Sequence, residues 1–172
     1  MKRVLLCTIA VLMLAGLAVA AGDMTPQQVM DKVMNCPVCS AWNPVAQNIR
    51  YDIFSTKTGT IESFVNANAA EQDKWDACAV DCEKRMEGVP SMTADQKAML
   101  CPMCQARMGL MSTKDVSVQN FKTHTGFITV STWTSPAGQK ALNEYATSMK
   151  NTSEMLEAAA KAMDPGTMKS KM

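Results

Sequence analysis

A Cys-Pro-x-Cys motif that occurs twice limits the possible folds of this chain more than any other feature. The copies lie at residues 36–39 and 101–104, an offset of 65. Further along the chain, a Phe-x-Thr-x-Thr-Gly segment also occurs twice, at 54–59 and 121–126, an offset of 67. Because matching segments recur in the same order, the sequence indicates an internal duplication.

Each copy is predicted to contain a helix, a hairpin and a second helix. Thr25 and Thr93 are expected to cap the opening helices. The residue before a proline disfavours helix, so these helices should end near Cys36 and Cys101, and each cysteine should cap the turn that follows. Apolar periodicity predicts the remaining elements: hairpins at about 49–65 and 116–134, and helices at about 69–86 and 136–163.

The predicted fold class is therefore α+β, with two tandem αββα modules. Their hairpins can pair into one four-stranded antiparallel sheet. The expected organisation has four parts: a signal peptide at 1–20, the first module at 21–90, the second module at 91–163 and a flexible tail at 164–172.

The first twenty residues are typical of a cleavable signal peptide. Lys2 and Arg3 precede an apolar run at 4–20 that ends in Ala-Val-Ala, so cleavage is expected before Ala21. Cys7 lies within this run and would be removed with it. The sequence thus predicts a periplasmic or secreted protein with no membrane partner after cleavage.

Charge excludes a nucleic-acid partner. The whole chain has 17 basic and 16 acidic residues, and loss of Lys2 and Arg3 leaves a net charge near −1. A protein that binds nucleic acid through its phosphates carries a basic surface, which this composition does not supply.

The first copy has four cysteines, and two interpretations of them stay open. Cys78 and Cys82 are four residues apart on a predicted helix, so both thiols share a face. They can form disulfides with Cys36 and Cys39, which an exported location favours. Alternatively, all four can bind one tetrahedral zinc ion.

The second copy retains only Cys101 and Cys104. Alignment of the closing helices places Tyr145 at the position of Cys78 and Met149 at the position of Cys82. The pair can form a local disulfide, act as a redox pair at a helix N-terminus, or bind Cu(I) with Met149 as a third sulfur ligand.

A further arrangement joins the copies. The two motifs can share one metal across a pseudo-twofold axis, although 61 intervening residues, 40–100, mean that the fold must supply the proximity. His124 is the only histidine and has no paired nucleophile, so the sequence carries no hydrolase constellation and favours a protein that is not an enzyme.

The motif segments at 36–41 and 101–106 resemble two families. Thioredoxin-fold oxidoreductases share the Cys-Pro-x-Cys residues alone. Exported copper-accessory proteins of nitrous oxide reductase and related heavy-metal-binding modules combine Cys-x-x-Cys with duplicated small α+β units. The second resemblance implies an exported protein that binds a metal through its cysteines.

These observations favour a non-enzymatic carrier or scavenger of copper or zinc, with a recipient metalloprotein as a possible partner. The expected ligands are the six cysteines of the two copies and Met149. Two alternatives stay open: thiol–disulfide exchange through Cys101 and Cys104, and a disulfide-stapled interaction domain without chemistry.

Overall fold

The computed structural model describes residues 24–163, so the predicted signal peptide and the predicted tail lie outside the described residues. No helix of the described part is long and apolar enough to cross a membrane. The elements follow in this order: α2 (Pro26–Met34), η2 (Cys39–Asn48), β1 (Ile49–Ser55), β2 (Gly59–Asn66), η3 (Ala69–Glu71), α3 (Gln72–Gly88), η4 (Val89–Ser91), α4 (Ala94–Ala98), α5 (Pro102–Met111), β3 (Val116–Lys122), β4 (Gly126–Trp133) and α6 (Pro136–Met163). The α+β class is confirmed.

The two opening helices, α2 and α4, begin with the same cap. Thr25 Oγ1 accepts a hydrogen bond from the backbone of Gln28, whose side chain accepts one from the backbone of Thr25. Thr93 and Gln96 repeat this arrangement at α4. Each reciprocal pair satisfies two backbone donors that a helix start leaves without a partner. Both predicted caps are confirmed.

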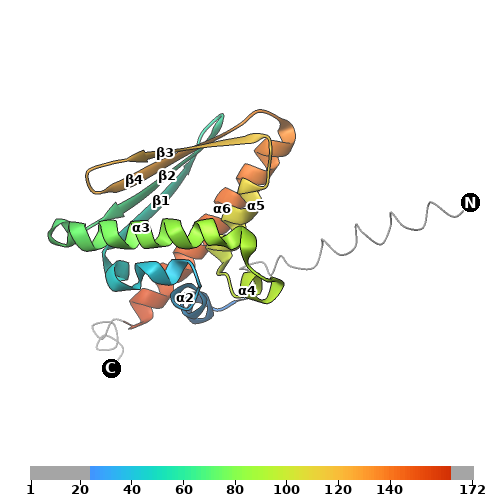
Figure 1. The fold of residues 1–172 in the computed structure, drawn as a ribbon. Coiled ribbons are helices and arrows are strands. Elements are labelled where there is room, and N and C mark those ends of the chain that lie inside the picture. Colours follow the sequence, from blue (N-terminus) through green and yellow to red (C-terminus); the bar gives the residue numbers. More distant parts are fainter. Residues whose placement is uncertain (1–23, 164–172) are drawn as a thin grey trace, which may run out of the picture.

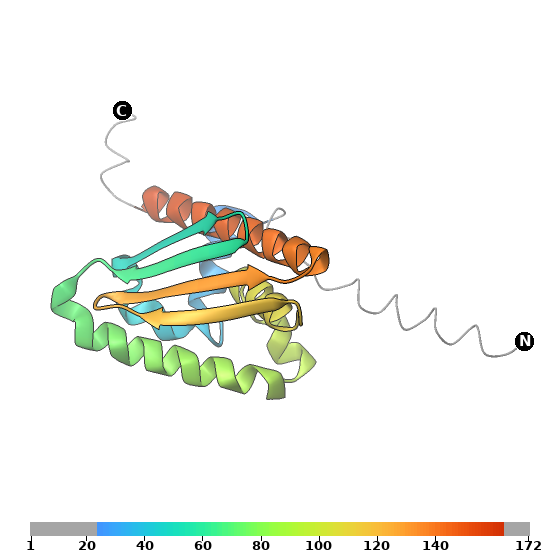
Figure 2. The same cartoon turned by 90° about the horizontal axis from the view of Figure 1, so that it is seen from above.

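The two hairpins form one antiparallel sheet with the strand order β1-β2-β4-β3. The central strands β2 and β4 pair so that Glu62 lies opposite Thr129, its equivalent at the offset of 67. One face of the sheet is open, and α6 runs along the β1 side while α3 runs along the β3 side (Figures 1 and 2). The sequence left open whether the two hairpins share one sheet, and the structure shows that they do.

The covered face of the sheet packs against two buried clusters. One is aromatic, with Trp42 of η2 and Trp75 of α3 4.8 Å apart between ring centroids and Phe64 of β2 4.9 Å from Trp42. The other is mainly aliphatic and lies between the sheet, α5 and α6; its buried members are Leu110, Leu142, Tyr145 and Met149. These clusters fix the helices beneath the sheet.

The central strands β2 and β4 approach each other so closely that each must begin with a glycine, Gly59 in β2 and Gly126 in β4. A Cβ on Gly59 would overlap the carbonyl oxygen of Ser131, and one on Gly126 would overlap that of Phe64. Gly126→Ala is therefore expected to destabilise the fold by about 2–3 kcal/mol, measured by urea unfolding. Gly109→Ala is the control, because its Cβ would meet nothing within 4 Å and alanine favours the helix. Equal stability of Gly126→Ala and the wild type would contradict this account.

One local prediction is wrong. Cys101 is the N-cap of α5, as expected, but Cys36 caps no helix. The chain turns through residues 37–38 and enters the 3-10 helix η2, whose N-cap is Val38. Pro44 lies inside η2 and has no backbone donor, so a regular α-helix cannot form there.

Candidate metal centre

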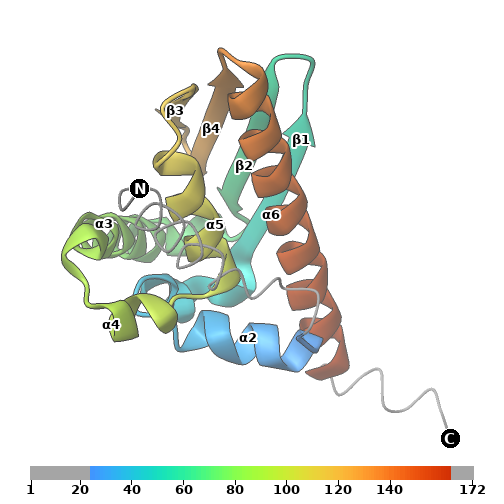
Figure 3. The same cartoon turned by 90° about the vertical axis from the view of Figure 1, so that its right-hand side faces the viewer.

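The two Cys-Pro-x-Cys motifs meet beneath the sheet. The first follows α2 and the second follows α4, and Figure 3 shows α2 and α4 together on the side of the molecule away from the sheet. The sulfur atoms of Cys36, Cys39, Cys101 and Cys104 all lie within 4.8 Å of one another. Each motif supplies two of the four sulfur atoms.

The distances between sulfur atoms of different motifs are short. Cys39 Sγ lies 3.2 Å from Cys104 Sγ and 3.4 Å from Cys101 Sγ. Cys36 Sγ lies 3.7 Å from Cys104 Sγ. A tetrahedral zinc ion with Zn–S bonds of about 2.3 Å requires sulfur atoms about 3.8 Å apart. The observed group is close to that size, so the four cysteines can hold a metal ion.

The same backbone turn shapes both motifs. The amide of Ser40 donates to the carbonyl of Cys36, and the amide of Gln105 donates to that of Cys101, each at 3.0 Å. This turn brings the two thiols of each motif to one side. The start of α5 also places the second motif at a helix N-terminus, where the helix dipole stabilises negative charge on sulfur.

Arg85 of α3 holds the first motif from outside. Its guanidinium donates to the carbonyl oxygen of Pro37 at 3.2 Å and to Ser40 Oγ at 2.9 Å. Asp81, one turn earlier on α3, accepts from the same side chain at 2.7 Å. The second motif is held in place by the start of α5. The first motif lies outside a regular α-helix, so the contacts of Arg85 hold its backbone in place instead.

Apolar residues enclose the sulfur atoms. Cys36 and Cys101 are 0% exposed, Cys104 is 3% exposed and Cys39 is partly exposed. Val38, Val89 and Leu100 are buried in the same cluster. Its partly buried neighbours include four methionines: Met86, Met92, Met103 and Met108. The centre is therefore largely buried, with thioether side chains packed against its cluster, and Cys39 is its one partly exposed cysteine.

Contacts among the thiols shift the pKa values of Cys36, Cys39 and Cys104. The pKa of the Cys36 thiol is lowered because Cys101, and after it Cys104 and Cys39, hydrogen-bond to its sulfur. The backbone amide of Cys101 also donates to Cys36 Sγ, at 3.4 Å. The pKa values of Cys39 and Cys104 are raised, chiefly by their contacts with Cys101 and further by burial. A bound cation would replace the remaining protons and draw charge from all four sulfurs.

Three sequence-predicted site residues lie outside this four-cysteine group. Cys78 is buried against Trp42 and Trp75, and Cys82, one turn further along α3, is partly exposed. Burial raises the pKa of both thiols. Met149 lies in the aliphatic cluster of α6. All six cysteines of the described residues are free thiols. Of the arrangements that the sequence left open, the structure shows the one in which the two motifs meet.

A buried charge network, which the sequence reasoning missed, lies beside the centre. Glu62 of β2 is 5% exposed, and its carboxylate accepts hydrogen bonds from Tyr145 at 2.8 Å and Tyr51 at 3.1 Å. Arg107 of α5, three residues after Cys104, forms an ion pair with it at 3.3 Å. Burial, together with the negative charge of Glu62, raises the pKa of both tyrosines. The sequence signal that could have revealed this network is Glu62, a charged residue on the inward face of β2.

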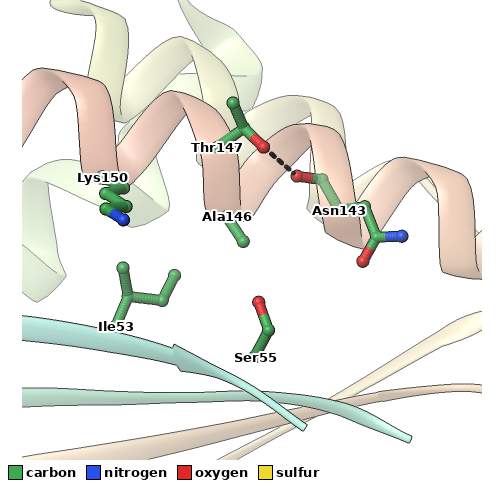
Figure 4. A pocket seen from close by; sticks show the side chains of 6 residues that line it. All are labelled: Ile53, Ser55, Asn143, Ala146, Thr147 and Lys150. Atoms are coloured by element: carbon green, nitrogen blue, oxygen red, sulfur yellow. Dashed lines mark hydrogen bonds between the residues drawn. The ribbon is translucent and has the colours of Figure 1, made fainter. Parts of the chain in front are cut away.

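A shallow pocket lies elsewhere, between β1 and α6, with a volume of about 290 Å³. Figure 4 shows its side chains, which include no sulfur ligand: Ile53, Ser55, Asn143, Ala146, Thr147 and Lys150. Thr147 Oγ1 is already bonded to the carbonyl of Asn143 at 2.9 Å. None of the four clustered cysteines lines this pocket.

Comparison of the chain with protein-family models, curated proteins and solved structures finds no match. The geometry of the site is therefore the evidence for its function.

Proposed function

We propose that this is an exported, non-enzymatic protein that binds one soft or borderline metal ion through Cys36, Cys39, Cys101 and Cys104. The observation that carries the proposal is the convergence of four thiols from two distant motifs within 4.8 Å. Thiolates select Cu(I) and Zn(II) over hard cations. A centre of this kind suits a carrier or scavenger of copper or zinc.

Burial supports a metal over thiol–disulfide exchange. An exchange protein needs a thiolate that a substrate disulfide can reach. Cys101 is 0% exposed and Cys104 is 3% exposed, so the second motif offers no such sulfur. A buried ring of four sulfur atoms is instead the usual environment of a tetrahedral metal.

We further infer that the centre arose by duplication of an αββα unit. Glu62 and Thr129, equivalent at the offset of 67, face each other at the middle of the β2–β4 pair. Gly59 and Gly126 make the same close approach to equivalent carbonyls. Each half supplies the two cysteines of one Cys-Pro-x-Cys motif. A single ancestral unit would therefore complete a site of four cysteines only by pairing with a second unit.

Metal titration of the reduced protein tests the proposal. We expect one Zn(II) or Co(II) ion per chain, and the Co(II) form should show the intense sulfur-to-metal and visible bands of a tetrahedral thiolate site. The intact mass of protein purified from the periplasm should show a chain that begins at Ala21 and is free of disulfides. Three disulfides with no bound metal would contradict the proposal.

A further inference from the structure

Two further sulfur side chains, Cys82 and Met86 of α3, pack against the cluster that holds the four-cysteine group. Cys82 and Met86 are four residues apart, so they project from the same side of the helix. Both pack against the buried cluster that contains Cys36, Cys101 and Cys104. Cys82 also packs against the aromatic cluster of Trp42 and Trp75, so it lies where the two clusters meet.

The four-cysteine site needs a way to release its ion. A metal held by four thiolates has no open coordination position, so one ligand must leave before another molecule can bind. Three of the four thiols are fully or almost fully buried, and Cys39 is the one that is partly exposed. Cys82 and Met86 are also partly exposed. Exchange must therefore begin at a sulfur that an acceptor can reach, and Cys39, Cys82 and Met86 are three such sulfur residues.

We propose that Cys82, assisted by Met86, is the exchange ligand through which Cu(I) enters and leaves the four-cysteine centre. This inference rests on the proposed function. In the exchange step the bond between Cu(I) and Cys39 Sγ breaks and a bond to Cys82 Sγ forms. The proton of the Cys82 thiol passes to the Cys39 thiolate, and copper stays Cu(I) throughout. Cys82 is partly exposed and lies outside the four-cysteine group, so an acceptor can reach the ion there.

The ligand types specify the ion. Thiolate together with thioether is the combination that selects Cu(I), whereas Zn(II) does not use thioethers in this way. Met86 lies one turn from Cys82, and Met92, Met103 and Met108 also pack against the cluster. A soft monovalent ion thus has sulfur ligands both inside the centre and along its margin.

The exchange ligand of the first half has no counterpart in the second half. At the position of Cys82 in the second half stands Met149, which is 5% exposed and packs with Leu110, Leu142 and Tyr145. The position of Cys78 is taken by Tyr145, whose hydroxyl is bonded to Glu62. The second half therefore offers no matching thiol, and release through α3 is the single route of this kind among the described residues.

The test is the rate of Cu(I) transfer from the reduced full chain to bicinchoninate, followed by absorbance. We expect Cys82→Ser to slow transfer about tenfold, the scale on which residues beside a metal site act, while still binding Cu(I) in the wild-type stoichiometry. Met86→Leu should slow transfer by a smaller factor. Cys78→Ser is the matched control, since Cys78 packs against the tryptophans and should leave the rate unchanged.

Each outcome decides the proposal. A wild-type transfer rate in Cys82→Ser, with Cu(I) still bound, would overturn the exchange ligand and leave the four-cysteine centre intact. A wild-type chain that binds Zn(II) but no Cu(I) would overturn it as well. Failure of the wild type to bind either ion would instead contradict the proposed function itself.

Discussion

Cys36→Ser and Cys104→Ser are each expected to weaken Zn(II) or Cu(I) binding by more than about a hundredfold, because loss of a direct ligand exceeds the effect of a neighbouring residue. The two substitutions should be equally damaging although they lie in different halves of the chain. The reason is geometric: Cys36 Sγ and Cys104 Sγ are 3.7 Å apart in one group. Competition with a chromophoric chelator gives the affinities.

The pattern across the other sulfur residues distinguishes this site from its alternatives. A site within the first half would require Cys78, and a copper site within the second half would require Met149. Both lie outside the four-cysteine group, so Cys78→Ser and Met149→Leu should bind metal nearly as the wild type does. A large loss of affinity in Cys78→Ser with little loss in Cys104→Ser would contradict the shared centre.

Metal loading should also stabilise the fold of the wild type and not of Cys104→Ser. A ligand present at 1,000 times its dissociation constant stabilises the folded state by about 4 kcal/mol. The ion would join segments that follow α2 and α4, which are otherwise held by the packing of Val38, Val89 and Leu100. Thermal unfolding with and without Zn(II) measures the difference.

The elements of the fold could be predicted because their signals are local. Thr25 and Thr93 cap helices, glycines end the hairpin turns, and the strands alternate in polarity, each within a few residues. The shared sheet was an open possibility, and its order needed the structure. Pairing of β2 with β4 joins residues 67 apart, such as Glu62 and Thr129, and no local pattern specifies that register.

The candidate site could be predicted in part for the same reason. The motifs identified Cys36, Cys39, Cys101 and Cys104 as candidate ligands, but spacing favoured partners within each half. Cys78 and Cys82 share a face of α3, as expected, yet neither belongs to the four-cysteine group. The contact between the motifs depends on how α2, α4 and α5 pack beneath the sheet, and this is a tertiary property that sequence periodicity does not contain.

Glu62→Leu is expected to destabilise the protein by about 2–4 kcal/mol, because it leaves three polar groups without their acceptor. Tyr145 and Tyr51 lose hydrogen bonds of 2.8 and 3.1 Å, and Arg107 loses its ion pair at 3.3 Å. Arg107 keeps 31% of its side chain exposed, so water recovers part of the cost. Urea unfolding of the reduced, metal-free protein measures the change.

The double variant Glu62→Leu/Arg107→Leu separates the loss of the ion pair from the loss of packing. Removing both charges should cost less than the sum of the single substitutions, because neither charge is then left without its partner. Glu154→Leu is the matched control, since its contact with Lys150 at 4.0 Å is exposed and is worth less than about 1 kcal/mol. Strictly additive effects at Glu62 and Arg107 would show that the pair is not coupled. Arg107 follows Cys104 by about one helical turn, so coupling would mean that Glu62 also fixes the orientation of α5, which carries Cys104 and is capped by Cys101, two of the four candidate ligands.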